Sequence, residues 1–366
     1  MQIAIVGLAR SGKTTVFNTL TRGEAETGGY GGMTVNVGVV KVPDERLSRL
    51  TELFRPKREV AADVTYADLP APPTSADGTT PAEIPADQLA RLRNADALLH
   101  VVRAFDDPAV PWRPLVESFS IRRSTTARSA RMNSRSNRSR SRWASTLPSG
   151  CGTAAERESN ELELELLGRL APPLREGRPI RDLELTGDEA RRLRGFRFLT
   201  EKPVLVLLNL SESDIPHAAD MATALAAAYD HRHSRVEALS ARIEMEIGQL
   251  DADEAEVFRA DLGLAESSLE RVIRLSYELL GLISFFTVGP DETRAWTIPA
   301  GSTAVDAAAA IHTDLARGFI RAEVIGWQEL LELGSMAEAK RKGRLRSEGR
   351  TYLVQDGDCV EVLHSS

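Results

Sequence analysis

The fold is decided by the first twenty residues, MQIAIVGLARSGKTTVFNTL (Met1–Leu20). They predict a strand (Met1–Val6), a loop (Gly7–Thr14) and a helix (Thr15–Leu20) in succession. The loop fits the pattern G-x-x-x-x-G-K-[ST], whose backbone N–H groups cradle a phosphate chain. Gly7 and Gly12 permit backbone conformations that a Cβ atom would obstruct, so successive N–H groups can point inward. The helix that follows adds the positive end of its dipole. The stretch therefore predicts a P-loop nucleotide-binding site.

The loop pattern also assigns roles to single side chains. Lys13 is expected to reach the β- and γ-phosphates and to act as the catalytic residue, and the Thr14 hydroxyl is expected to bind Mg²⁺. The residues expected to contact the nucleotide here are Gly7, Leu8, Ala9, Arg10, Ser11, Gly12, Lys13, Thr14 and Thr15.

Two further residues are candidates for the metal site. The glycine-rich stretch Gly23–Gly32 predicts a loop where P-loop switch proteins have their first switch, and Thr34 is better placed than Thr27 to complete the Mg²⁺ shell. The alternative is that Thr34 is an ordinary strand residue. Asp68 ends the predicted strand Ala61–Leu69, where a P-loop NTPase carries the acid that holds Mg²⁺.

The residues after Asp68 depart from the D-x-x-G motif of switch GTPases. Ala71 stands at the glycine position, in a run stiffened by prolines, and no glutamine follows to orient a water molecule. A conventional γ-phosphate switch and a loop without switching both remain open. Hydrolysis would have to position its nucleophile without that glutamine.

The composition is that of a soluble globular protein, since 42% of the 366 residues are hydrophobic and 27% are charged. This length predicts two or three domains. The net charge of −7 argues against wholesale non-specific binding of nucleic acid. Cys151 and Cys359 form no motif, so neither a disulfide framework nor a zinc site is indicated. No apolar run approaches the roughly 18 residues of a membrane span, and the first residues form a core strand and not a signal peptide. We therefore expect a cytoplasmic protein with no membrane partner.

Strands and helices alternate along the first part of the chain, which predicts an α/β fold with a doubly wound parallel sheet. The predicted strands besides the first are Val35–Val42, Ala61–Leu69, Ala97–Val102, Pro203–Leu208 and Val236–Leu239. Residues that bind ligands lie at the carboxyl ends of strands in such a sheet. The segments that follow Leu208 and Leu239 are therefore expected to approach the nucleotide.

The segment Asn209–Glu212 (NLSE) stands where GTPases carry N-K-x-D, whose aspartate binds guanine through two hydrogen bonds. Here the lysine is absent and Glu212 is one methylene longer, so guanine loses a bidentate contact that discriminates by about 1–3 kcal/mol. Adenine loses nothing comparable. Asn209 and Glu212 therefore favour ATP, or dual use of ATP and GTP. The alternative is that this segment is only a polar turn.

These motifs resemble the YchF branch of the Obg-related P-loop proteins. The segments that carry the resemblance are Gly7–Thr14, Asn36–Val40, Val42–Leu47, Asn209–Glu212, Ser240–Glu246, Phe285–Gly289, Arg294–Thr297, Gly301, Ile311–Asp314, Arg317–Val324 and Val354–Asp358. The resemblance implies ATP binding, slow Mg²⁺-dependent hydrolysis and association with ribosomes. Ser240 and Ala241 are accordingly expected at the nucleotide. Members of the family carry a hydrophobic residue in place of the catalytic glutamine, which agrees with its absence here. The family commonly has D-x-x-G where this chain has Asp68–Ala71, and P-N-x-G-K-S where it has Ala9–Thr14.

The resemblance also implies three parts of the chain. These are a nucleotide-binding domain (1–108 and 200–281), a helical hairpin insertion (109–199) and a TGS domain (282–366), which is a small β-grasp module. Helical periodicity in the insertion is predicted for 154–170 and 188–199. In the last part, strands are predicted at 282–288, 295–298, 319–325, 350–354 and 359–363, and a helix at 304–317.

Residues 115–155 form an anomalous Arg/Ser-rich stretch. From Ser118 to Ala155 there is no acidic residue, while eight arginines alternate with serines and other small residues. Three interpretations remain open: a basic arm that contacts RNA phosphates, a solvated loop, or a sequence altered by two compensating frame errors. We favour the third, because GC-rich coding DNA translated out of frame gives Arg/Ser-rich sequences without acidic residues.

Lys340–Arg350 (KRKGRLRSEGR) is the second basic run, and it predicts either a contact with RNA or a solvated loop. The expected partners are thus ATP or GTP, and the ribosome or RNA through the insertion and the TGS domain. The leading functional hypothesis is a slow ATPase that regulates translation at the ribosome. The rival hypotheses are a nucleotide-sensing scaffold that binds RNA or protein, and a GTP-specific switch.

Overall fold

The computed structural model describes residues 1–23, 35–71, 84–105, 154–264 and 266–365, with the backbone alone for 154–159. The chain divides into two compact units. Unit 1 comprises Met1–Asn36 and Ala67–Ala255, and unit 2 comprises Val37–Tyr66 and Glu256–Ser366. Thr34 and the Arg/Ser-rich stretch up to residue 153 lie outside the described residues. No helix in the described part of the chain is long and apolar enough to cross a membrane.

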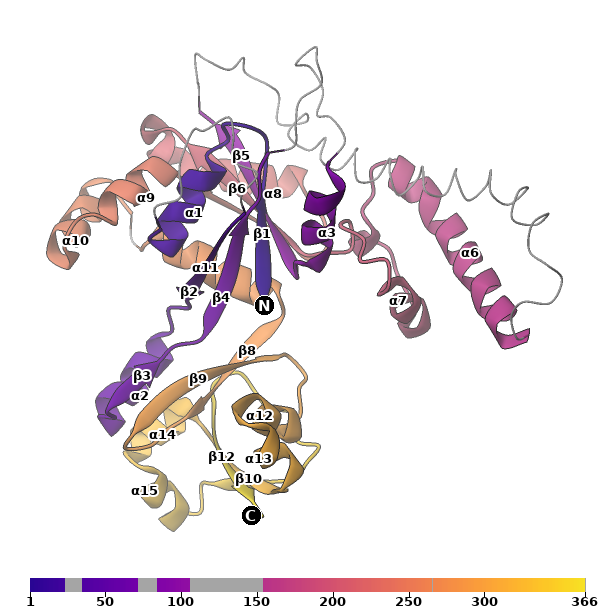
Figure 1. The fold of residues 1–366 in the computed structure, drawn as a ribbon. Helices are drawn as coiled ribbons and strands as arrows, with labels where there is room; N and C mark the ends of the chain where they lie inside the picture. Colours follow the sequence, from indigo (N-terminus) through magenta and orange to yellow (C-terminus); the bar gives the residue numbers. More distant parts are fainter. Residues whose placement is uncertain (24–34, 72–83, 106–153, 265, 366) are drawn as a thin grey trace. The chain divides into compact units, whose positions relative to one another are not determined.

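The first sheet has six strands in the order β2-β4-β1-β5-β6-β7 (Figure 1). They are β1 (Gln2–Val6), β2 (Asn36–Lys41), β4 (Asp63–Asp68), β5 (Ala97–Ala104), β6 (Val204–Leu210) and β7 (Ser234–Leu239). β1, β5, β6 and β7 pair in parallel. β5 and β6 read as continuous apolar runs because both of their faces are buried. The predicted α/β fold is confirmed.

Helices of unit 1 cover both faces of this sheet (Figure 1). On one face lie α1 (Lys13–Thr21) and α9 (Ala241–Ile247), which contact each other. On the other face, α3 (Ala86–Asn94) and α8 (Ala218–Ala228) pack apolar side chains on Val102, Val206 and Leu208. The loop between β1 and α1 therefore opens at the carboxyl edge of the parallel strands.

The insertion in unit 1 contains α6 (Ala154–Arg175), the 3₁₀ turn η1 (Ile180–Asp182) and α7 (Gly187–Leu193). Leucines of α6 pack with Ile180 and Leu193 in a small core of their own. The predicted helix at 188–199 was too long. α7 begins at a capping box of Thr186 and Glu189 and ends at Leu193, and Phe196 and Phe198 then pack against this core.

Unit 2 is built on a second, mixed sheet with the order β11-β10-β12-β8-β9-β3. Its strands are β3 (Arg58–Val60), β8 (Leu282–Thr287), β9 (Glu292–Pro299), β10 (Phe319–Gly326), β11 (Arg346–Glu348) and β12 (Asp358–His364). Its helices are α2 (Glu45–Phe54), α11 (Ser268–Leu279), α12 (Ala304–Ile311), α13 (Thr313–Arg317), α14 (Trp327–Leu333) and α15 (Met336–Arg341), and α10 (Ala252–Asp261) contains the unit boundary. The core of unit 2 lies between the sheet and the alanine-rich α12.

Three expectations for the last part of the chain are wrong. The helix predicted at 304–317 is two helices, because His312 is extended and its Nδ1 accepts the N–H of Asp314 as a new helix cap. The strand predicted at 350–354 is absent from the described structure, where Leu353 makes only an isolated bridge and β11 pairs with β10 instead. Lys340–Arg350 is not one loop, since it contains the end of α15 and the whole of β11.

Candidate nucleotide-binding site

The loop from Gly7 to Gly12 connects the end of β1 with the start of α1. Gly12 has φ +90°, and a Cβ atom at this position would lie 2.1 Å from Asn209 Nδ2. A Cβ atom on Gly7 would lie 2.5 Å from the carbonyl oxygen of Val101. The close approach of β5 and β6 to the loop therefore requires glycine at both positions.

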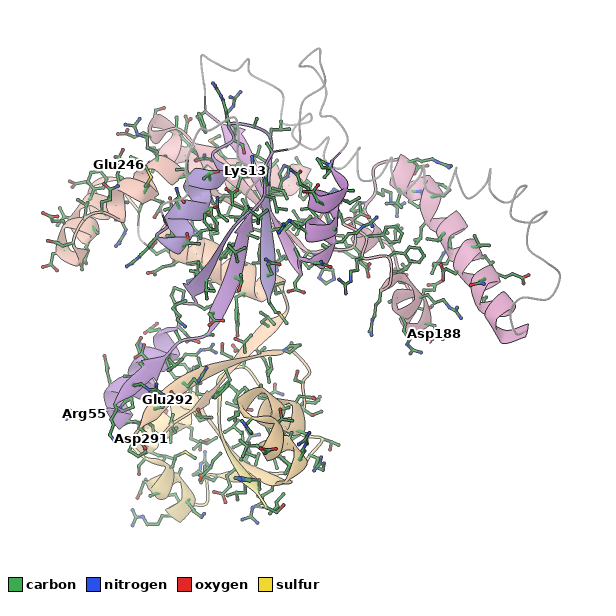
Figure 2. The ribbon with its side chains drawn as sticks, in the orientation of Figure 1. Lys13, Arg55, Asp188, Glu246, Asp291 and Glu292 are labelled. Carbon is green, nitrogen blue, oxygen red and sulfur yellow. The ribbon has the colours of Figure 1, made fainter. Side chains whose placement is uncertain are left out.

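Lys13 begins α1 (Figure 2). Its side chain is buried, and the residue is only 7% exposed. Its Nζ donates a hydrogen bond to the carbonyl oxygen of Leu8 at 2.8 Å, inside the loop. Burial lowers the pKa of Lys13 to about 8, while the charge of Asp68 opposes the shift. The ammonium group is still mostly protonated at pH 7, so the loop holds a poorly solvated positive charge that an anion would stabilise.

Thr14 and Asp68 face each other beside Lys13. The Thr14 hydroxyl donates to Asp68 Oδ2 at 2.9 Å. Burial raises the pKa of Asp68, against the hydrogen bond from Thr14, the charge of Lys13 and the side chain of Asn36. Asp68 Oδ1 is buried. A hydroxyl and a buried carboxylate at one place form a donor set that suits Mg²⁺.

Asn209, at the end of β6, connects the loop to the start of α9. Its Nδ2 donates to the carbonyl oxygen of Ser11 at 3.0 Å, and its Oδ1 accepts the N–H of Ala241 at 3.0 Å. Thr19 of α1 lies 3.4 Å from the carbonyl oxygen of Ala241. The amide of Asn209 thus fixes the Gly7–Gly12 loop and the β7–α9 junction to each other.

The other residues expected near the base lie at the ends of β6 and β7. Leu210 stands where GTPases have lysine, and it is buried in the core between the sheet and α8. Glu212 is exposed and begins the 3₁₀ helix η2 (Glu212–His217), and Ser211 Oγ, just before it, donates to Asp214 Oδ2 at 2.6 Å. Ser240 and Ala241 are both buried at the start of α9.

The structure therefore brings together most of the residues that the sequence selected. Hydrogen bonds link Thr14 to Asp68, Ser11 to Asn209 and Asn209 to Ala241, while Lys13 bonds to Leu8 within the loop. Glu212 takes no part in these four bonds. Sequence reasoning missed Thr19 and the bracing role of Asn209. The available signal for Thr19 was a polar residue on the otherwise apolar face of α1. No cluster of three or more His, Cys, Asp or Glu side chains that could hold a metal occurs in the described structure.

Two families match the chain. Residues 2–130 match the family described as 50S ribosome-binding GTPase. Residues 282–364 match the C-terminal family of YchF GTPases, described as a protein of unknown function.

Relatives match over nearly the full length. A protein of Bacillus subtilis (strain 168) named ribosome-binding ATPase YchF is 35% identical over 363 residues, which cover 97% of each chain. The protein of the same name from Pasteurella multocida is 36% identical, with 98% of this chain and 97% of that protein covered. The solved structure of the Schizosaccharomyces pombe YchF GTPase is 25% identical and superposes with a TM-score of 0.82 over 99% of this chain and 97% of that chain.

Proposed function

Because the chain belongs to the YchF family, we propose that it binds ATP at Gly7–Thr14 and hydrolyses it slowly with Mg²⁺. The observation that carries this proposal is the constellation of Lys13, Thr14 and Asp68. A buried ammonium lies in a glycine-bounded loop, and a hydroxyl–carboxylate pair lies directly beside it.

Mg²⁺ would be held by the Thr14 hydroxyl and Asp68, with Thr34 as a third proposed ligand from outside the described residues. The ion, when bound, neutralises charge on the phosphate oxygens. Lys13 would exchange its hydrogen bond to Leu8 for the β- and γ-phosphates, and Gly7–Thr15 would supply the remaining contacts.

Adenine is the proposed base, so the proposed nucleotide is ATP. The less specific alternative is that the site accepts both ATP and GTP. Leu210 lies in the core and cannot provide the ammonium group of an N-K-x-D lysine. Glu212 would meet the base with a carboxylate displaced by one methylene, and Asn209, Ser240 and Ala241 would form the wall behind it.

Slow turnover is proposed because the three described residues after Asp68 offer no polar side chain to orient a water molecule, and no glutamine stands there. Leu69, Pro70 and Ala71 have apolar side chains, and Leu69 is buried. Positioning of the phosphates by Lys13 and the metal would supply most of the acceleration.

The relatives are named ribosome-binding ATPases, and we extend ribosome association to this chain as a proposal, together with a cytoplasmic location. The proposed division is a nucleotide-binding domain (1–108 and 200–281), a helical insertion (109–199) and a TGS domain of β-grasp fold (282–366). The match that begins at residue 282 and the mixed sheet packed on α12 support the last part.

The test is release of phosphate from γ-labelled ATP by the wild type and Lys13→Ala. Slow, Mg²⁺-dependent release that disappears in the variant is expected. Release that does not depend on Lys13, or no release at all, would favour the nucleotide-sensing scaffold.

Calorimetric titration with ADP and GDP tests the choice of base. We expect ADP to bind at least as tightly as GDP. A preference for GDP of about tenfold, or 1.4 kcal/mol, would overturn the role of Glu212 and favour the GTP-specific switch.

A further inference from the structure

The segment Val37–Tyr66 belongs to unit 2, although in the sequence it lies between the phosphate loop and Asp68. β3 of this segment extends the second sheet by pairing in parallel with β9. The backbone N–H groups of Lys57 and Arg58 donate to the carbonyl oxygens of Pro290 and Asp291. Residues 37–66 are therefore built into the same unit as the C-terminal part of the chain.

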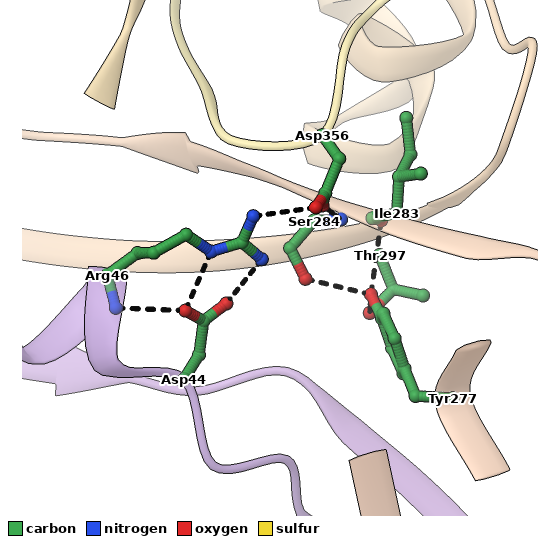
Figure 3. A network of polar contacts seen from close by, with 7 residues as sticks. All are labelled: Asp44, Arg46, Tyr277, Ile283, Ser284, Thr297 and Asp356. Atoms are coloured by element: carbon green, nitrogen blue, oxygen red, sulfur yellow. Dashed lines mark hydrogen bonds and ion pairs between the residues drawn. The ribbon is translucent and has the colours of Figure 1, made fainter. Parts of the chain in front are cut away.

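Arg46, in the first turn of α2, belongs to a network of polar contacts within this unit (Figure 3). Its Nε and Nη2 donate to the two oxygens of Asp44, each at 2.8 Å, and its Nη1 donates to Asp356 Oδ2 at 2.7 Å. Asp44 is also the N-cap of α2. One guanidinium thus joins the start of α2 to the loop before β12.

The same network continues into β8. Asp356 Oδ1 accepts the backbone N–H of Ser284 at 2.9 Å, and the hydroxyl groups of Ser284 and Tyr277 lie 3.0 Å apart (Figure 3). The Arg46 guanidinium lies over the ring of Phe286, 5.3 Å from its centroid. The bidentate, charge-assisted bonds to Asp44 fix the orientation of the guanidinium. Its bond to Asp356 and its contact with the Phe286 ring connect it to β8.

A short path of bonds leads from Arg46 to Asp68. Asp44 follows Val42 by two residues, and Val42 N–H donates to the carbonyl oxygen of Ala62 at 2.8 Å. Ala62 directly precedes β4, which runs without interruption from Asp63 to Asp68. The strand that carries Asp68 is therefore anchored at its other end within unit 2.

We propose that Arg46 is a positioning residue of the nucleotide site, which couples the state of Asp68 to β8 and the loop 355–358 through residues 37–66. This proposal rests on the proposed binding of nucleotide at Gly7–Thr14. A ligand that engages Asp68 biases the position of β4, and the Arg46 network transmits the bias to the C-terminal strands. Linkage makes the effect reciprocal, so a partner that binds the C-terminal strands changes nucleotide affinity by the same factor.

The experiment is hydrogen–deuterium exchange on the full chain, with and without Mg²⁺ and a non-hydrolysable ATP analogue. In the wild type, nucleotide slows exchange in the loop 7–14 and also changes exchange in β8 and in 355–358. In Arg46→Ala, the loop is still protected, at a nucleotide concentration higher by about tenfold, but β8 and 355–358 no longer respond.

The matched control is Arg49→Ala, on the same helix, because Arg49 is half exposed and pairs with Glu45 one turn away. It should behave as the wild type. Should Arg46→Ala fail to fold by circular dichroism, Asp356→Asn replaces it, since the amide can still accept the Ser284 N–H but loses its charge toward Arg46.

A wild type whose β8 and 355–358 do not respond to nucleotide would overturn the proposal, as would a folded Arg46→Ala that responds like Arg49→Ala. Failure of the proposed function has a different signature, namely a wild type in which the loop 7–14 gains no protection.

Discussion

The Gly7–Thr14 loop and the basic segment Lys340–Arg350 both contain positively charged side chains. The two regions differ in how far these side chains are buried and in whether acidic groups pair with them. In the loop, Lys13 is buried, and Ser11 Oγ has no hydrogen-bond partner among the described residues. In the basic segment, Lys340 pairs with Glu323 and Arg346 with Asp358, within 3.4 Å.

The rest of the basic segment follows the same rule. Arg341 and Lys342 share Glu338, Arg344 pairs with Glu329, and Arg350 donates to the carbonyl oxygen of Phe319. A buried polar atom without a partner is costly, and a bound phosphate chain would offer a partner to Ser11 Oγ. Acidic side chains pair with five of the six cations of Lys340–Arg350, which favours a structural role for this segment over a contact with RNA.

Gly12→Ala should have the largest effect, because the new Cβ would meet Asn209 Nδ2 at 2.1 Å and the residue would be held at φ +90°. We expect loss of stability of about 1–3 kcal/mol and a fall in ATP affinity of more than about a hundredfold. Chemical denaturation and calorimetry measure both. Gly177→Ala is the control, since Gly177 has φ +86° with no atom within 4 Å of its Cβ position. Equal effects at the two glycines would mean that backbone strain alone is responsible.

Lys13→Met should weaken ATP binding by about tenfold to a hundredfold, the value of a hydrogen bond to a charged group. Stability without nucleotide should hold or rise, because the substitution removes a buried charge. Lys340→Met, at an exposed and paired lysine, should leave the affinity unchanged. Calorimetry and thermal melting of both variants make the comparison. If Lys340→Met weakened ATP binding as strongly as Lys13→Met, the paired lysine would matter as much for the nucleotide as the buried one, and the contrast between the two regions would fail.

Raising the pH should weaken ATP binding above the pKa of Lys13. Burial lowers that pKa to about 8 in the free protein, and bound phosphate favours the protonated form. Affinity is therefore constant below about pH 8 and falls above it, by up to about tenfold for each pH unit. In Lys13→Arg the guanidinium stays charged, so the affinity should not depend on pH in this range. Titrations between pH 7 and 10 that gave parallel curves for both proteins would contradict this assignment.

Arg344→Ala should have the smallest effect. Its side chain is 61% exposed and pairs with Glu329, and such surface pairs contribute about 0–1 kcal/mol. ATP affinity and co-sedimentation with ribosomes should not change. Loss of co-sedimentation in a variant with wild-type stability would restore the RNA-contact interpretation of this segment.

Some features could be predicted from neighbouring residues alone. The strand Gln2–Val6, the loop and the helix from Lys13 follow from one short pattern, and the buried strands β5 and β6 follow from continuous apolar runs. The break at His312 could not be predicted, because the alanine-rich sequence on its N-terminal side has strong helix propensity. The role of Asn209 as a brace also needed the structure, since its partners Ser11 and Ala241 are distant in the chain.

The sequence by itself determined the strand–loop–helix at the start of the chain, the parallel sheet and the selection of Lys13, Thr14 and Asp68 as candidate site residues, because these depend on local spacing and on the periodicity of apolar residues. Only the tertiary structure decided that residues 37–66 join the C-terminal unit and that the cations of Lys340–Arg350 are paired. Arg46 and Asp356 are 310 residues apart in the chain, and no local pattern specifies a contact across that separation. Such contacts form when packed strands and helices bring the two side chains together.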